Sequence, residues 1–251
     1  MSSIRPGGPT THPVWEALGA PLALLPEGRR RSILLLGLGG GAVARVARTL
    51  APHAQIVAVD RDHEVVAAAH RHFGLDDLNV EVVVEDARAF LERERQPYDA
   101  VLEDIFVGPG RSVRKPEWLP EPGLTLALAR LSPGGFLASN TIHERAAVAR
   151  ALLRHRRTLV QIAVEDYVNH ILVAGPANWS AASLRCVLAS EPRLRRTLPR
   201  LSLRTLRQAP EHSGAPDSLG RGATGGEPEG RGGVRGSVPP RVRTRSRPRL
   251  R

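Results

Sequence analysis

The stretch from Ser32 to Asp60 limits what this chain can fold into more than any other part of the sequence. An apolar run, Ile33 to Leu36, leads into a turn with four glycines in five residues. A second apolar run, Ile56 to Val59, ends at Asp60, and the residues from Ala42 to Ala47 between the runs have a helix-forming composition. Buried strand, tight turn, helix and second strand, in this order, predict one βαβ unit.

The glycines of this turn have a mechanical role. Gly37, Gly39 and Gly41 allow a sharp turn and leave space for a ligand over the helix N-terminus, because they have no Cβ atom. Asp60, at the end of the second strand, is placed to accept hydrogen bonds from both hydroxyls of a ribose. The turn therefore predicts a nucleoside-containing cofactor. Its spacing satisfies both the dinucleotide pattern G-x-G-x-x-A and the shorter G-x-G-x-G of S-adenosylmethionine (SAM) enzymes, so both classes remain open at this point.

Strand-like and helix-like patterns alternate after Asp60. We expect strands at 80–84, 98–102, 136–139, 158–164 and 170–174, and helices at 64–72, 87–95, 123–131 and 145–154. This alternation, closed by a β-hairpin, predicts an α/β fold with a Rossmann-like, doubly wound sheet of seven strands, mostly parallel with one antiparallel strand. That is the arrangement of class I SAM methyltransferases. An acid after the third strand, Asp86, also lies where SAM enzymes hold the adenine amino group, and both observations favour SAM over a nicotinamide cofactor.

Composition divides the chain into four parts. Residues 1–28 are rich in proline and form an N-terminal extension, and residues 29–176 form the SAM-binding Rossmann-like domain. Residues 177–208 hold periodic leucines and seven basic residues against one acidic, which predicts a basic helical extension. Residues 209–251 hold almost no large apolar side chain, so we expect a disordered basic tail. The net charge of +11 belongs to the C-terminal part, because Arg30 to Pro176 has 18 basic and 18 acidic residues.

The sequence offers no pattern for a metal site or a membrane span. Cys186 is the only cysteine, which excludes an intrachain disulfide and a cysteine-based zinc site and fits a reducing, cytoplasmic location. His70 and His72 lie two residues apart and cannot share one helix face, which argues against a metal pair. No run approaches the ~20 apolar residues that a membrane span needs, and the N-terminus lacks the layout of a signal peptide.

The chain between Arg31 and Ala174 resembles spermidine synthases and their spermidine-synthase-like relatives, through four motifs in order: LLLGLGGGAVARV, IVAVDRDHEVVAAAHRHFGL, VEVVVEDARAFL and YDAVLEDIF. The resemblance implies a Rossmann-like transferase that binds SAM or decarboxylated SAM. By position, it implies these cofactor contacts: Gly37, Gly39 and Gly41 in the loop, Asp60 at the ribose, and Asp86 with Ala87 at the adenine.

The resemblance also implies a catalytic position. Asp104 stands where aminopropyltransferases keep the base that deprotonates the attacking amine, and the neighbouring Glu103 is the second catalytic candidate. A carboxylate at the C-terminal tip of a strand faces the ligand crevice of such a sheet. In-line attack on a sulfonium carbon needs a neutral, oriented amine, which a carboxylate base supplies.

Two positions depart from the aminopropyltransferase pattern. The aspartate that grips the aminopropyl amine is replaced by Gly40, and the second aspartate of the D-x-x-D substrate motif is replaced by Val107. The small N-terminal β-domain that helps to close the polyamine site also finds no counterpart in the roughly 30 residues before the first strand. Because a diamine needs carboxylates at both ends, we predict methyl transfer to a small-molecule acceptor, such as an amine.

Two alternatives stay open. The first is aminopropyl transfer from decarboxylated SAM to a polyamine, with a rearranged substrate site. The second is a non-catalytic cofactor-binding protein that acts through its basic tail, whose arginines predict weak binding to polyanions. A homodimer is also among the predicted partners, so the chain is expected to associate with a second copy of itself. The candidate acceptor contacts are Asn140, His143, Glu144 and the loop from Arg111 to Trp118.

Overall fold

The computed structural model describes residues 12–208, and the tail expected at 209–251 lies outside this part. Its strands are β1 (Ser32–Leu36), β2 (Gln55–Asp60), β3 (Val80–Val84), β4 (Tyr98–Glu103), β5 (Leu131–Thr141), β6 (Thr158–Val164), β7 (His170–Ala174) and β8 (Leu201–Arg207). Its α-helices are α1 (Pro13–Gly19), α2 (Ala42–Leu50), α3 (His63–Phe73), α4 (Ala87–Arg93), α5 (Gly123–Leu128), α6 (Arg145–Leu153) and α7 (Ala181–Ser190). None of these helices has both the length and the apolar character needed to cross a membrane.

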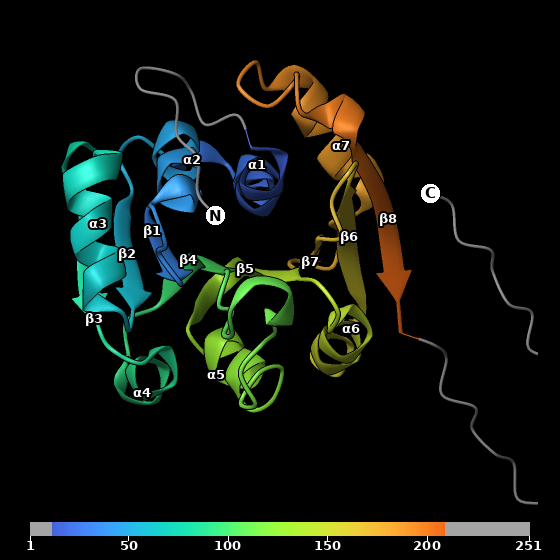
Figure 1. Cartoon of the computed structure of the whole chain (residues 1–251). Helices are drawn as coiled ribbons and strands as arrows, with labels where there is room; N and C mark the ends of the chain where they lie inside the picture. Colours follow the sequence, from blue (N-terminus) through green and yellow to red (C-terminus); the bar gives the residue numbers. More distant parts are fainter. Residues whose placement is uncertain (1–11, 209–251) are drawn as a thin grey trace, which may run out of the picture. The chain divides into compact units, whose positions relative to one another are not determined.

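The eight strands form one sheet in the order β3-β2-β1-β4-β5-β7-β6-β8 (Figure 1). The first five strands in this order, β3-β2-β1-β4-β5, are parallel to one another. In contrast, β7 runs antiparallel to both β5 and β6, and β8 runs antiparallel to β6. The predicted Rossmann-like, mostly parallel sheet and its closing hairpin are therefore confirmed. The sheet has one strand more than the predicted seven, and two strands rather than one run against the others.

The additional strand comes from residues expected to be helical. Within 177–208, only Ala181–Ser190 forms an α-helix, and Leu201–Arg207 pairs with β6 from Val164 to Thr158. Leu201 and Leu203 are buried while the residues between and after them, Ser202 and Arg204, are exposed. This alternation of two residues is the pattern of a strand with one buried face. Pairing with β6 decides the structure here, against the helical spacing of the leucines upstream.

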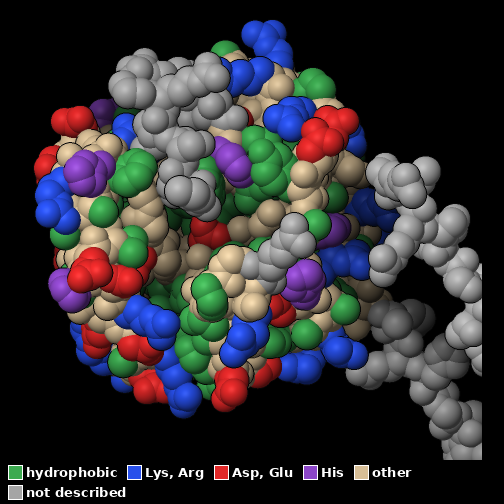
Figure 2. Space-filling model, viewed as in Figure 1, with side chains coloured by type: hydrophobic (Ala, Val, Ile, Leu, Met, Phe, Trp, Pro, Cys, Tyr) green, Lys and Arg blue, Asp and Glu red, His purple; other side chains and the backbone are tan. Residues whose placement is uncertain are grey.

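Helices cover both faces of the sheet (Figure 1). α1, α2, α3 and α7 pack on one face, and α4, α5 and α6 pack on the other. Alternate side chains of a strand enter the two cores: Ile33 and Leu35 of β1 belong to the first, and Leu34 and Leu36 belong to the second. A strand buried on both faces has a continuous apolar sequence, which is why β1 was recognisable as a strand. Basic and acidic side chains are interspersed over the surface seen in Figure 2, in line with the balanced charge of this part.

The N-terminal helix α1 is tied to the core and to the C-terminal segment. Gly19 approaches α2 so closely that a Cβ atom would lie 2.4 Å from Cγ1 of Val46. Glu16, which is 5% exposed, accepts hydrogen bonds from the side chains of Thr197 and Arg196. These contacts hold α1 in place, and Trp15 on this helix influences the pKa of Asp104, the first residue after β4.

Candidate active site

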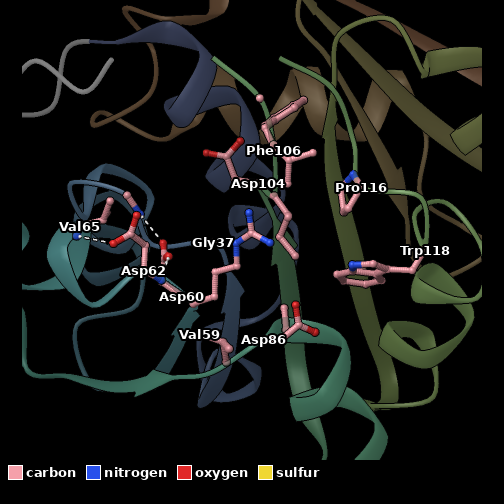
Figure 3. Close-up of a pocket in the computed structure, with 16 residues that line it drawn as sticks. Gly37, Val59, Asp60, Asp62, Val65, Asp86, Asp104, Phe106, Pro116 and Trp118 are labelled. Atoms are coloured by element: carbon pink, nitrogen blue, oxygen red, sulfur yellow. Dashed lines mark hydrogen bonds between the residues drawn. The ribbon is translucent and has the colours of Figure 1, made fainter. Parts of the chain in front are cut away.

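A cavity of about 350 Å³ opens where the carboxyl ends of β1, β2, β3 and β4 meet (Figure 3). Ligands of open α/β sheets bind at this edge, because the loops that follow parallel strands gather there. Six of the eight residues assigned to the site from the sequence line this cavity: Gly37, Gly39, Asp60, Asp86, Ala87 and Asp104. The other two, Gly41 and Glu103, lie outside its lining.

Gly37 and Gly41 shape the turn between β1 and α2. Gly37 has a φ of +90°, and a Cβ atom there would lie 2.8 Å from the backbone oxygen of Asp104. A side chain at this position would therefore push the ends of β1 and β4 apart. Gly41 is the N-cap of α2 and has a φ of +77°. Its role is to begin α2 at the cavity rather than to form the cavity surface.

Asp60 lies beside the glycine turn at the end of β2 (Figure 3). Its Oδ2 accepts hydrogen bonds from the backbone N–H groups of Leu38 at 3.0 Å and Gly39 at 3.1 Å. Its Oδ1 accepts one from the backbone N–H of Asp62 at 3.1 Å and retains capacity for another. The carboxylate thus fixes the turn and also presents an acceptor oxygen at the cavity.

Asp86 and Asp62 are helix caps at the same cavity. Oδ1 of Asp86 accepts hydrogen bonds from the backbone N–H groups of Arg88 at 3.0 Å and Ala89 at 3.2 Å, at the start of α4. Asp62 caps α3 in the same way. Aspartate is favoured at this position because its oxygen pairs an N–H group that has no partner inside the helix. Two helices therefore begin at the cavity, each with a carboxylate at its N-terminus.

Asp104 follows β4, and its carboxylate lies at the cavity (Figure 3). Nδ2 of Asn140 donates a hydrogen bond to its Oδ1 at 2.7 Å, and Trp15 adds a smaller influence that lowers its pKa. Burial raises the pKa of Asp104 to about 6, and Glu103 adds to this rise. The Asn140 hydrogen bond, the Lys115 ammonium and Trp15 oppose the rise without cancelling it. Such a carboxylate is mostly ionised at pH 7 and is a stronger base than an ordinary aspartate.

Glu103 does not line the cavity, and its role as the second catalytic candidate stays an untested prediction. Its side chain is 1% exposed, and Oε1 lies 2.6 Å from Nζ of Lys115 in a buried ion pair. The backbone N–H of Ile105 donates to Oε1 at 2.7 Å, and Oγ of Ser139 donates to Oε2 at 2.5 Å. Successive residues in extended backbone point to opposite sides, so Glu103 points away from the side of Asp104. It holds the loop after β4 in place through Lys115.

Two aromatic residues of this loop line the cavity: Trp118, which belongs to the loop expected to contact the acceptor, and Phe106, which was not assigned to the site from the sequence. The ring of Phe106 lies 4.0 Å from Nζ of Lys115. Trp118 lies across the cavity from Asp60 (Figure 3) and packs on Gly123, where a Cβ atom would meet the indole at 2.4 Å. The signal that could have identified Phe106 is its position as an aromatic residue directly after a strand end.

The two positions that depart from the aminopropyltransferase pattern supply no carboxylate here. Val107 lines the cavity and forms a backbone bridge with Arg114, with N–O distances of 2.8 and 2.9 Å. The loop therefore folds back on itself next to the cavity. Gly40 lies within the glycine turn and is not part of the cavity surface.

The residues predicted from the sequence to contact the acceptor differ in where they lie relative to the cavity. Asn140 supports Asp104, as described above, and Glu144 fixes the loop by accepting a hydrogen bond from the backbone N–H of Lys115 at 2.8 Å. His143 does not line the cavity. Across residues 12–208, no group of three or more His, Cys, Asp or Glu side chains is arranged to hold a metal ion.

Comparisons with known proteins identify the class of domain. Residues 33–109 match a family model described as a methyltransferase domain. The chain is 32% identical over 126 residues to polyamine aminopropyltransferase 2 of Pseudomonas aeruginosa, a match over 46% of this chain and 35% of that protein. It is 31% identical over 102 residues to an eEF1A lysine and N-terminal methyltransferase homolog of Drosophila pseudoobscura pseudoobscura, a match over 38% of this chain and 15% of that protein. The chain thus covers well under half the length of these relatives.

Solved structures show the same fold. Human methyltransferase-like protein 13 in complex with SAH has a TM-score of 0.61 and 24% identity, over 82% of this chain and 98% of that one. A probable spermidine synthase from Corynebacterium glutamicum has a TM-score of 0.56 and 19% identity, over 76% and 73% of the two chains. The domain match, the named relatives and the shared fold agree, and the resemblance is confirmed. Residues 33–109 thus match a methyltransferase domain, and the chain shares its fold with these solved structures.

Proposed function

We propose that this chain is a SAM-dependent methyltransferase that acts on an amine. One observation carries the proposal: apart from the cofactor-type residues and Asp62, which caps α3, Asp104 is the one carboxylate that residues 12–208 place in the cavity lining, while Gly40 and Val107 supply none. Aminopropyl transfer to a diamine needs carboxylates for several ammonium groups. Methyl transfer to one amine needs a single base in line with the donor.

The residues that line the cavity fit a SAM-type cofactor. Asp60 and Asp86 offer acceptor oxygens for ribose hydroxyls and for an adenine amino group, beside the glycine turn. Arg61, a cation in the same lining, complements a carboxylate, which SAM carries and decarboxylated SAM lacks. When bound, SAM supplies a methyl group on a positively charged sulfonium, a charge that the surrounding carboxylates favour.

In this proposal Asp104 binds the acceptor and takes its proton. Its carboxylate is mostly ionised at pH 7, so it attracts an ammonium group and accepts a proton as the nitrogen becomes the nucleophile. Phe106 and Trp118 cover the cavity beside it with apolar surface. The names of the two relatives agree with this acceptor class, since one names polyamines and the other names lysine and N-terminal groups.

Aminopropyl transfer remains the second candidate. The 32% identity to a polyamine aminopropyltransferase favours it, and Asp104 could serve as the base there as well. The two reactions leave different products from the cofactor: methyl transfer converts SAM to S-adenosylhomocysteine, and aminopropyl transfer converts decarboxylated SAM to methylthioadenosine.

Product analysis tests the proposal. The full chain is incubated with each cofactor in turn and with putrescine, spermidine, a lysine peptide and a peptide with a free N-terminus. We expect S-adenosylhomocysteine with at least one amine, and its loss by about 100-fold or more in Asp104→Asn. If the reaction with decarboxylated SAM gives methylthioadenosine and the reactions with SAM give no S-adenosylhomocysteine, the second candidate replaces the proposal. Absence of both products with all four acceptors would contradict the choice of acceptor class.

A further inference from the structure

Asn140 joins the cavity to the turn between β6 and β7. It lies in β5 and is 3% exposed. Its Nδ2 donates a hydrogen bond to Oδ1 of Asp104 at 2.7 Å, and its Oδ1 accepts one from Nδ2 of Asn169 at 3.0 Å. Asn169 is half-buried and immediately precedes β7. Three side chains from three separate segments therefore form one chain of hydrogen bonds that ends on the catalytic candidate.

The chemistry of these groups fixes the direction of the chain. An ionised carboxylate has no hydrogen to donate, so Asn140 has to present its NH₂ group to Asp104. The carbonyl oxygen of Asn140 then faces the opposite way, where the NH₂ group of Asn169 donates to it. A reversed amide would set two acceptor oxygens against each other at Asp104 and two donors against each other at Asn169.

We propose that Asn140 is a positioning residue that orients the Asp104 carboxylate and keeps it ionised, and that Asn169 holds Asn140 in the amide orientation that this requires. The importance of this arrangement for catalysis rests on the methyltransferase proposed above. The arrangement itself concerns the charge of Asp104 and can be measured without an acceptor.

The groups around Asp104 determine the direction in which its pKa should shift when Asn140 is replaced. Three influences lower its pKa: the hydrogen bond from Asn140 is the largest, the Lys115 ammonium is second, and Trp15 is the smallest. Burial and the Glu103 carboxylate act in the opposite direction. Removal of the Asn140 donor therefore leaves burial less opposed, and the protonated form of Asp104 extends to higher pH.

Carbon-13 NMR titration of the aspartate carboxyl groups in the full chain tests the proposal. Asp104→Asn identifies the Asp104 resonance, whose midpoint we expect near pH 6 in the unmodified protein. Asn140→Leu should move the midpoint up by about 1–2 pH units, since a hydrogen bond to a charged group contributes ~1.5–3 kcal/mol and one unit corresponds to ~1.4 kcal/mol. Asn169→Ala should move it in the same direction by a smaller amount.

Thr141→Val is the matched control. Thr141 is fully buried on the same strand, and its Oγ1 donates to the backbone oxygen of His170 at 2.8 Å without contact to Asp104. This variant should lower stability and leave the midpoint in place. An unchanged midpoint in Asn140→Leu, or in Asn169→Ala if Asn140→Leu does not fold, would overturn the proposal. Titrations that shift as expected in a chain that forms no S-adenosylhomocysteine would refute the function and support the positioning role.

Discussion

The burial that makes the Asp104 carboxylate a stronger base also lowers the stability of the folded protein. Burial raises its pKa from 3.8 to about 6, so the folded state holds the proton more tightly than the unfolded state. The ionised form consequently destabilises the fold. This penalty is absent below pH 3.8, grows as the pH rises to about 6, and stays constant above.

Substitution of Asp104 by asparagine should therefore stabilise the protein at neutral pH. We expect the free energy of unfolding at pH 7 to rise by ~1–3 kcal/mol, since one pKa unit corresponds to ~1.4 kcal/mol. Because the penalty disappears in acid, the gain should shrink toward zero near pH 4. Urea unfolding of both proteins from pH 4 to pH 8 measures this difference. A gain that is independent of pH, or a loss at pH 7, would contradict the account of Asp104.

Gly37 is the residue on which the geometry of the turn depends. Gly37→Ala should lower the free energy of unfolding by ~1–3 kcal/mol or more, because its φ is +90° and the new Cβ would lie 2.8 Å from the Asp104 backbone oxygen. Gly28→Ala is the control, since no atom lies within 4 Å of a Cβ there. Thermal unfolding of both variants compares them. Equal effects would show that the turn tolerates a side chain.

At the scale of elements, the loop after β4 depends on one buried ion pair. Lys115→Met should destabilise the protein by ~3–5 kcal/mol, because it leaves the Glu103 carboxylate buried without a cation. The double variant with Glu103→Gln should recover part of that loss. Arg88→Met, which breaks the exposed pair with Glu92, should cost less than about 1 kcal/mol. Denaturant unfolding tests the series, and a Lys115 variant as mild as the Arg88 variant would contradict it.

Local sequence pattern was sufficient to predict those elements that are determined by residues adjacent in the sequence. The apolar run of β1, the glycine turn and the acids after β2 and β3 were all recognisable, because neighbours in sequence determine them. The pair of Glu103 with Lys115 was not recognisable, since it joins residues 12 positions apart across a loop. The position of Trp118 likewise depends on its packing against Gly123.

At the scale of the whole molecule, β8 shows why the strand count could not be predicted. Leu201 and Leu203 alternate with exposed residues over too short a stretch to outweigh the helical spacing of the leucines before them. The strand forms because β6 offers seven residues for pairing, from Thr158 to Val164. Similarly, α1 reaches the candidate site only because the folded chain brings Trp15 to Asp104.

The same arrangement gathers the cofactor-type residues from β1, β2, β3 and β4 into one cavity. Calorimetric titration of the full chain with SAM and, side by side, with decarboxylated SAM tests the central claim most directly. The account predicts tighter binding of SAM, since in the proposed function Arg61, a cation in the cavity lining, complements the carboxylate that distinguishes the two ligands. Tighter binding of decarboxylated SAM, or no binding of either, would contradict it.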